Sequence, residues 1–298
     1  MSTAEAEARE LQVEAQGGLW REAFERLRRN PGAIVGAAVI LAFVLTAVFA
    51  SQIAPFDPRQ QVGGLSVRPP GPSADHVFGL DGQGRDVFSR VVFGTRLSLI
   101  VGLVSVAVGL SIGFVLGATA GYLGGKVDAV VMRVMDVLLS IPALLIAIAL
   151  VTLLGRGLIQ VMVAVGVTTI PVFARLLRGS ILAQREADYV LAARAVGVPG
   201  HRILLRHILP NALAPVVVQA TLAVATAIID VAALSFLGLG PADPALPEWG
   251  QMLAEAAPRL QNTPHLVLFP GAAIVVSVLA INLIGDGLRE ALDPRFKL

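Results

Sequence analysis

Apolar and polar residues alternate along this chain in long blocks rather than in short periods. A helix needs roughly 17 to 25 mostly apolar residues to cross the hydrocarbon core of a membrane. Six blocks meet or approach that length, and they predict transmembrane helices at approximately Ala33–Ala50, Leu97–Ala120, Val137–Leu154, Leu158–Ala174, Ala212–Phe236 and Leu266–Ile284. Prolines within these blocks, at Pro142, Pro171 and Pro215, are expected to kink the helices.

The composition supports an integral membrane protein of the all-α class. Of the 298 residues, 55% are hydrophobic and 15% are charged, and the mean hydropathy is +0.76. These values favour a lipid-embedded chain over a soluble one. The arginines are scattered between apolar blocks, which argues against nucleic-acid binding. Because the chain has no Cys, disulfides, thiolate metal sites and cysteine nucleophiles are excluded.

The placement of positive charge predicts how the spans cross the membrane. Residues 1–31 are charged and show no cleavable signal peptide, so the first span is expected to remain as an anchor. Lys and Arg are enriched in alternate connecting segments, and by the positive-inside rule both termini are then cytoplasmic. Arg85, Arg90 and Arg96 are the main exceptions, because they crowd the outer start of the second span.

The connecting segments are of two kinds. The outer loops, Ser51–Arg96 and Leu237–His265, are rich in Pro and Gly, which favours rigid irregular loops outside the lipid. The long inner loop, 176–211, alternates charged and apolar residues with helical spacing, so it is expected to be structured helix. The predicted organisation is a cytoplasmic N-terminal segment, a first span with its extracytoplasmic loop, a transmembrane core that includes the inner loop, and a cytoplasmic tail, at residues 1–31, 32–96, 97–286 and 287–298 respectively.

The centre of the inner loop predicts a sharp helix-turn-helix. Residues 188–196 form helix readily, and Asp188 is placed to cap that helix or to favour the positive end of its dipole. Gly197 can take the left-handed conformation that ends a helix. Val198 is held extended by Pro199, which suits the first turn of a new helix.

The second short helix is expected to be amphipathic. Arg202 and Arg206 lie four residues apart on one face, while apolar residues occupy another. Pro210 then falls in the first turn of the fifth span, where no amide donor is needed. A projection of this kind can fit into a groove of a soluble partner.

This inner segment resembles the cytoplasmic coupling loop of binding-protein-dependent ABC importers. The family pattern is Glu-Ala-Ala, three residues, Gly and, about a dozen residues later, Leu-Pro. Its spacing is kept here by Ala192, Ala193, Gly197, Leu209 and Pro210. Leu191 replaces the usual Glu and His207 the usual Ile, and Glu186 and Asp188 are the candidates to supply the missing acidic charge. The residues that the resemblance assigns to ATPase coupling are Glu186, Asp188, Tyr189, Ala192, Ala193, Gly197, Arg202, Arg206, Leu209 and Pro210.

Most of the chain is similar to the C-type permease subunit of the dipeptide and oligopeptide importers. The motifs that carry this similarity, in the order of the family, are Phe78-Gly79-Leu80-Asp81, Gly84-Arg85-Asp86, Ala120-Gly121-Tyr122-Leu123-Gly124-Gly125, His207-Ile208-Leu209-Pro210-Asn211-Ala212, Leu234-Ser235-Phe236-Leu237-Gly238-Leu239-Gly240, Trp249-Gly250, Gly285-Asp286-Gly287-Leu288-Arg289 and Leu292-Asp293-Pro294-Arg295. The resemblance implies six spans of the type I ABC importer permease kind in a bacterial inner membrane.

The resemblance also implies partners. These are a sister B-type permease, two cytoplasmic ATP-binding subunits that hold ATP and Mg²⁺, and an external substrate-binding protein. The chain itself would then be a non-enzymatic subunit without a cofactor. Relatives of this kind carry dipeptides, oligopeptides, glutathione or nickel, and these substrates stay open as alternatives. Gly124-Gly125-Lys126 does not make a phosphate-binding loop, because Ala120 and Val127 occupy the positions that need Gly and Ser or Thr.

Intramembrane charges supply the remaining candidates. Asp230, toward the outer end of the fifth span, either lines the transport path, with Ser235 as a second candidate, or is hydrated or paired at the interface. Arg133 with Asp136, and Asp286 with Arg289, are expected to be ion pairs on helix surfaces, at spacings of three residues.

Two other classes of protein are weighed against the importer. An intramembrane enzyme would need a nucleophile with a base, or metal ligands, at bilayer depth. An ion-coupled secondary carrier would be expected to show an inverted repeat and several mid-span acids. Neither pattern is present in the sequence.

Overall fold

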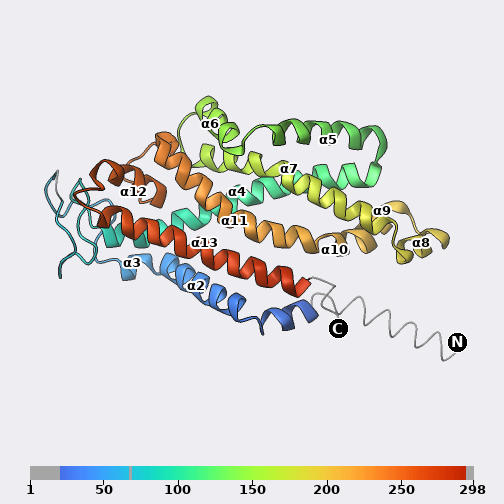
Figure 1. The fold of residues 1–298 in the computed structure, drawn as a ribbon, viewed down its shortest axis with the longest axis horizontal. Coiled ribbons are helices and arrows are strands. Elements are labelled where there is room, and N and C mark those ends of the chain that lie inside the picture. The colour runs from blue at the N-terminus through green and yellow to red at the C-terminus, as the bar shows by residue number, and fades with distance from the viewer. Residues whose placement is uncertain (1–20, 67–68, 293–298) are drawn as a thin grey trace.

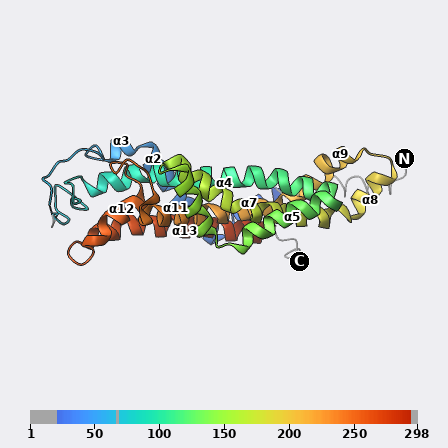
Figure 2. The ribbon, with the colours of Figure 1, turned by 90° about the horizontal axis from the view of Figure 1, so that it is seen from above.

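The computed structural model describes residues 21–66 and 69–292, and over these residues it is a bundle of long helices. The bundle is elongated, with α8 and α9 protruding at one end and α12 beside long irregular loops at the other (Figure 1). The view from above shows the same two ends (Figure 2). They are called the α8 end and the α12 end below.

The helices follow one another along the chain with short connections, apart from the loops between α3 and α4 and between η2 and α12. Two short π-helical turns are labelled η1 and η2, and a 3₁₀ turn is labelled η3. The elements are α2 (Pro31–Val48), α3 (Ala50–Ile53), α4 (Val87–Leu123), α5 (Gly125–Ser140), α6 (Ala143–Leu154), α7 (Leu158–Arg185), α8 (Asp188–Ala195), α9 (Gly200–Ile203), η1 (Leu204–Ile208), α10 (Leu209–Ala212), α11 (Ala214–Leu234), η2 (Ser235–Leu239), α12 (Trp249–Ala256), η3 (Ala257–Arg259) and α13 (His265–Leu292).

Five of the helices are long and apolar enough to cross a membrane, and they confirm five of the predicted spans. The third predicted span, Val137–Leu154, is wrong as a single helix, because α5 and α6 meet there at a bend of 93°. The break lies at Ile141, whose backbone is extended (φ −102°, ψ 133°), directly before Pro142. A residue before proline is disfavoured in the helical conformation, which is the physical reason for the break. The count of six spans holds when α5 and α6 are taken as one broken span.

Helices α4 and α7 form the spine of the bundle. Glycines recur on α4 at intervals of four, and a Cβ atom at Gly109, Gly113 or Gly117 would lie 2.4, 2.8 or 2.5 Å from a carbonyl oxygen of α7. Without side chains at these positions the two backbones approach closely, as is common between membrane helices. Fully buried side chains of α7, among them Phe173 and Leu177, complete this contact.

Helix α2 lies at the side of the bundle, where it packs against α13 and α4 (Figure 1). It begins at Pro31 with Asn30 as its N-cap, whose side chain accepts a 3.0 Å hydrogen bond from the amide of Ala33. Most of its large apolar side chains, such as Ile34 and Leu41, are exposed. This is the surface expected of a helix in contact with lipid.

The intramembrane ion pairs differ from those that the sequence predicts. Asp136 pairs with Arg175 of α7 rather than with Arg133, and Arg178 of α7 pairs with Asp128 of α5. No ion pair joins Asp286 to Arg289 among the residues that the structure describes. The predicted pairs are neighbours on one helix, whereas the observed ones join two helices and hold α5 against α7.

Candidate functional site

The residues assigned to coupling gather at the α8 end, beyond the last turn of α7. Helix α7 continues to Arg185, so the predicted inner loop begins inside a helix. Arg185 donates hydrogen bonds to the carbonyls of Gly121 (3.0 Å) and Tyr122 (3.3 Å), two orphan acceptors at the C-terminus of α4. The base of the protruding helices is therefore joined to the spine.

The predicted helix-turn-helix is present. Helix α8 ends in a residue with left-handed backbone, Gly197, at φ 79°. The amide of Val198 donates to the carbonyl of Ala193 (3.0 Å), and that of Gly197 donates to the carbonyl of Arg194 (3.0 Å). This pair of bonds is the Schellman motif, which satisfies carbonyls at a helix end and turns the chain sharply. Asp188 lies in the first turn of α8, where it favours the helix dipole without making a capping hydrogen bond.

The second half of this element departs from the expected geometry. Pro210 lies in the first turn of α10, as predicted, but α10 is not a separate start of the span, because α9, η1 and α10 run on almost without interruption into α11. The amide of Leu209 instead reaches back five residues to the carbonyl of Leu204, which is a π-type hydrogen bond. A widened turn directly before a proline accommodates the missing amide donor. Arg202 and Arg206 are both exposed, on the outer side of this turn.

Buried apolar residues attach the element to the spans. Val190 of α8, Ile203 of α9 and Ile208 of η1 are almost completely buried and belong to the same apolar core as Leu177 and Ile181 of α7. The protruding helices are therefore an extension of the bundle and share its apolar core.

Tyr189 makes the polar part of this attachment. Its hydroxyl contacts the side-chain oxygen of Gln184 at the end of α7 and lies 3.4 Å from the carbonyl of His207. It also accepts a 3.3 Å hydrogen bond from Asn211 of α10, and burial raises the pKa of the phenol. The Tyr189 hydroxyl thus connects α7, which precedes the protruding element, with η1 within it and α10 after it.

The outward side of the element is apolar and uncovered. Val196 is 80% exposed, Leu205 61% and Leu191 46%. Exposed arginines, Arg194 and Arg202, flank them. A protruding apolar tip with a positively charged rim is typical of a protein-docking surface.

A mainly apolar cavity with several polar groups in its wall opens beside Tyr189 at the same end of the bundle. Its volume is about 770 Å³, and α7, α8, α10, α11 and α13 all contribute to its lining. The polar groups in it include Gln184, Asn211, Gln219 and Arg289. A space of this size admits a short peptide or a molecule of similar bulk.

The two pathway candidates lie in different surroundings. Asp230 lies eleven residues after Gln219 on α11, about 16 Å along the helix axis. It is partly exposed and has no ion pair or hydrogen bond with any residue that the structure describes, and Thr226 is exposed one turn before it. Ser235 is completely buried, with Gly240 and Gly250 packed so closely that a Cβ on either would come within 3.0 Å of its side chain. In this conformation Ser235 does not face an open path.

An ion cluster at the α12 end has no counterpart in the sequence-based prediction. Arg85 is only 2% exposed and donates hydrogen bonds to Asp81 (2.7 Å), to Glu255 of α12 (2.7 Å) and to the carbonyl of Pro244 (3.1 Å). It thereby ties the loop before α4 to the loop before α12 and to α12 itself. The close spacing of Asp81 and Arg85 in the loop motif could have indicated an ion pair between these two residues. The pairing of Arg85 with Glu255 could not be predicted in this way, because Glu255 lies 170 residues away.

Helix α12 is held in place by a second buried acid. Glu248 accepts 2.8 Å hydrogen bonds from the amides of Gly250 and Gln251 and so caps the helix. Burial raises the pKa of this carboxyl above its ordinary value, against the opposing effect of the two amides. The adjacent Trp249 is completely buried and donates to the carbonyl of Val91 (3.1 Å), which joins α12 to α4.

The fold is that of a multi-pass helical membrane protein with a protruding helical element between two of its spans. A family model of the binding-protein-dependent transport system inner membrane component matches residues 113–298. A model of the N-terminal transmembrane domain of oligopeptide transport permease C matches residues 18–70. The chain belongs to the binding-protein-dependent inner membrane component family, whose members are permease components of ABC importers, with the ATPase on partner subunits.

Individual relatives cover nearly the whole chain. It is 47% identical to the dipeptide transport system permease protein DppC of Alkalihalophilus pseudofirmus, over 93% of this chain and 90% of that protein. It is 44% identical to the glutathione transport system permease protein GsiD of Pectobacterium atrosepticum, over 93% and 92% of the two chains. A di/tripeptide permease protein DppC of Pseudomonas aeruginosa is 43% identical over the same shares.

A solved structure supports the fold. A chain of the MetNI methionine ABC transporter in an inward-facing conformation aligns with a TM-score of 0.57 at 22% identity, over 68% of this chain and 96% of that one. The type I importer fold predicted from the sequence is thereby confirmed. The predicted family is confirmed by the family models and by the relatives described above.

Proposed function

We propose that this chain forms half of the transport path of an ATP-driven importer of di- or oligopeptides. Two of the relatives described above are permease proteins for dipeptides or di- and tripeptides, which supports this substrate class. The proposed assembly contains a sister B-type permease, two ATP-binding subunits that carry ATP and Mg²⁺, and an external substrate-binding protein. The α8 end faces the cytoplasm with both termini, in a bacterial inner membrane.

Coupling in this proposal rests on one observation. The apolar tip at the α8 end is uncovered, and Tyr189 together with the buried Val190 and Ile208 joins it to α7 and α11. ATP binding draws the two ATPases together and moves the docked tip, formed by α8, α9 and η1. Because Val190 and Ile208 are buried in the same core as α7, the movement is passed to α7 and α11. These helices then alternate between states that open toward opposite sides of the membrane.

Within this proposal the cavity of about 770 Å³ is the inner mouth of the path. Asp230, without a partner in this chain and on the same helix as Gln219, is the candidate to attract the ammonium group of a peptide. Ser235, the second pathway candidate, is buried between η2 and α12. It lines the proposed path only in a state in which the contact of α12 with η2 has opened.

Glutathione is a second candidate substrate, because a relative of nearly equal similarity is a glutathione permease protein. The two substrates are distinguished by measuring which of them, bound to the cognate external protein, stimulates ATP hydrolysis by the reconstituted complex.

A matched pair of substitutions tests the coupling role. Val196 at the α8 tip and Leu65 in the loop at the α12 end are equally exposed, at 80% each. Val196→Glu is expected to abolish copurification of the ATPase subunits and stimulated ATP hydrolysis, since it places a charge in the apolar contact. Leu65→Glu makes the same chemical change and is expected to leave copurification intact. Full copurification with both variants would overturn the proposed docking role.

A further inference from the structure

A groove lies toward the α8 end of the bundle, where α2 begins beside the end of α13 (Figure 1). Its volume is about 360 Å³, which is within the range of pockets that hold small molecules. Two guanidinium groups and one carboxylate line it, those of Arg26, Arg29 and Glu290. The groove, called the α2–α13 groove below, therefore presents charges of both signs.

The opposite charges of this groove do not pair with each other. Arg29 and Glu290 are both exposed, and neither has an ion pair with any residue that the structure describes. Glu290 accepts a 2.7 Å hydrogen bond at Oε2 from the side chain of Asn30, which holds the carboxylate at the groove. The donors of Arg29 and the second oxygen of Glu290 thus have no partner among the described residues.

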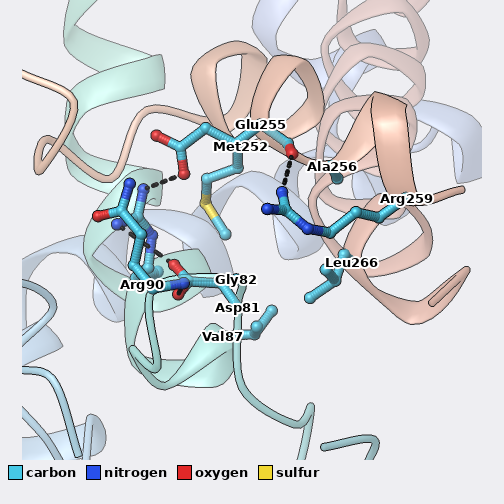
Figure 3. Close-up of a pocket in the computed structure, with 10 residues that line it drawn as sticks. Asp81, Gly82, Val87, Arg90, Met252, Glu255, Ala256, Arg259 and Leu266 are labelled. Carbon is cyan, nitrogen blue, oxygen red and sulfur yellow. Dashed lines mark hydrogen bonds and ion pairs between the residues drawn. The ribbon is translucent and has the colours of Figure 1, made fainter. Parts of the chain in front are cut away.

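The ion cluster at the α12 end is arranged in the contrasting way. Arg90 is completely buried there between Asp81 and Glu255, at 3.6 and 3.5 Å (Figure 3). Those charges neutralise one another inside the protein. In the α2–α13 groove, charges of both signs line one open space without meeting, and this arrangement suits a ligand that carries both an anion and a cation.

The groove lies at the depth of lipid headgroups. Helix α2 has 18 residues, and at about 1.5 Å per residue it is about 27 Å long, close to the hydrocarbon thickness of roughly 30 Å. Its large apolar side chains are exposed from Ile34 to Val48, as expected for contact with lipid tails over the whole length. Arg29 and Asn30, which directly precede α2, therefore lie where the hydrocarbon ends and the headgroups begin.

We propose that the α2–α13 groove binds the headgroup of phosphatidylethanolamine. The lipid phosphate accepts hydrogen bonds from Arg29 and Arg26, because guanidinium groups match phosphate oxygens. The primary ammonium of the ethanolamine donates to the open oxygen of Glu290. The acyl chains follow the exposed Ile34 of α2 and Leu283 of α13. The site lies on this chain alone and does not depend on the proposed transport cycle.

The charges of the groove distinguish phosphatidylethanolamine from two other phospholipids. Phosphatidylglycerol supplies the phosphate but no cation, so it leaves the carboxylate of Glu290 unpaired beside an anion. Phosphatidylcholine carries a quaternary ammonium, which has no N–H to donate to that carboxylate. Of the three, phosphatidylethanolamine alone satisfies both halves of the groove with hydrogen bonds.

Native mass spectrometry of the full chain in detergent, titrated with these three lipids carrying identical acyl chains, tests the site. The wild-type chain is expected to bind phosphatidylethanolamine about three- to fivefold more tightly than either other lipid. Arg29→Gln should weaken this binding by a similar factor, because the phosphate loses its partner. Arg28→Gln is the matched control, since Arg28 is the adjacent exposed arginine, lies over the ring of Phe24 and does not line the groove.

Glu290→Gln separates the two halves of the headgroup. It keeps an acceptor for Asn30 but removes the charge, so it should weaken phosphatidylethanolamine about three- to fivefold and should not weaken phosphatidylglycerol. Glu25→Gln, at an acid in an exposed pair with Arg21, should change neither. Equal binding of the three lipids by the wild-type chain would overturn the inference. Equal effects of Arg28→Gln and Arg29→Gln would also contradict it, because they would assign the binding to general attraction between basic residues and lipid.

Discussion

At the α12 end of the bundle Arg85 and Arg90 lie inside the protein, whereas at the α8 end Arg194, Arg202 and Arg206 point into solvent around uncovered apolar side chains. The first end uses its charges within the chain, to join the loop before α4 to the loop before α12 and to α12 itself. The second end leaves both charge and apolar surface free for another protein. Arginine-rich segments of one membrane protein can thus be buried in ion pairs at one end and left exposed at the other.

The backbone turns of the two ends differ in the same respect, since one is enclosed by protein and the other is open. Gly84 and Gly197 both have left-handed backbone, at φ 74° and 79°. A Cβ at Gly84 would lie 2.2 Å from the carbonyl oxygen of Gly63, while a Cβ at Gly197 would meet nothing within 4 Å. The α12 end is thus tightly packed around its turn, and the α8 end presents its turn to the outside.

The largest expected effect comes from breaking the ion cluster. Arg85→Met leaves the carboxylates of Asp81 and Glu255 without their main partner and should destabilise the protein by about 3–5 kcal/mol, or roughly 10 °C in the midpoint of thermal unfolding in detergent. Arg59→Met removes an exposed pair and should cost at most about 1 kcal/mol. Equal losses in the two variants would show that the burial of Arg85 has no energetic consequence.

The glycine pair predicts a smaller difference. Gly197→Ala should cost about 1–2 kcal/mol, because only the left-handed conformation penalises the added methyl group. Gly84→Ala should cost about 1–3 kcal/mol more, because the methyl also collides with Gly63. Denaturant or thermal unfolding of the two variants measures this difference. If Gly197→Ala were the more damaging of the two, the packing contrast between the ends would be refuted.

At the α8 end the two tyrosines of the chain form a natural comparison. Tyr189→Phe removes the hydroxyl contacts with Gln184 and Asn211, and should reduce stability by about 0.5–1.5 kcal/mol. ATP-driven uptake by the reconstituted complex should fall more than stability does. Tyr122→Phe is the control, since no hydrogen bond of that hydroxyl is present among the described residues, and it should leave both quantities unchanged. A normal ratio of transport to ATP hydrolysis in Tyr189→Phe would exclude a coupling role for the hydroxyl.

The smallest effect concerns pH and Glu248. Burial raises the pKa of this carboxyl above its ordinary value of about 4.5, so the folded protein holds the proton more tightly than the unfolded chain. Its contribution to stability is therefore complete below about pH 4.5 and is lost as the pH rises through the raised pKa. Glu248→Gln should flatten this slope in unfolding measured across that range. Glu186→Gln, an exposed acid at the α8 end, should keep the wild-type slope, and an unchanged slope in Glu248→Gln would assign the pH dependence to another group.

Hydropathy was sufficient to predict where most spans lie, because crossing lipid requires a long apolar run whatever its neighbours are. It placed the start of the second span at Leu97, whereas α4 begins at Val87. The ten additional residues include Arg90 and Arg96, which reduce the apolar character of the sequence. Arg90 is accommodated in the helix because protein, not lipid, surrounds it, and that environment is not visible in the local sequence.

The protruding element formed by α8, α9 and η1 shows the same division. Gly197 and Pro199 predicted the sharp turn, since the conformations they favour are local properties. The π-helical turn before Pro210 and the contacts of Tyr189 with Gln184 and Asn211 were not predicted. They depend on how α7 and α10 come to lie beside the element.

The sequence by itself determined the all-α membrane class, the approximate spans and the position of the protruding element, because apolar length, proline and glycine act on the chain locally. Only the tertiary structure decided which charges meet. Asp136 pairs with Arg175 instead of Arg133, and Arg85 meets Glu255 across 170 residues of chain. Ion pairing depends on distances of a few ångströms between side chains, and these distances are set by helix packing rather than by spacing along one helix.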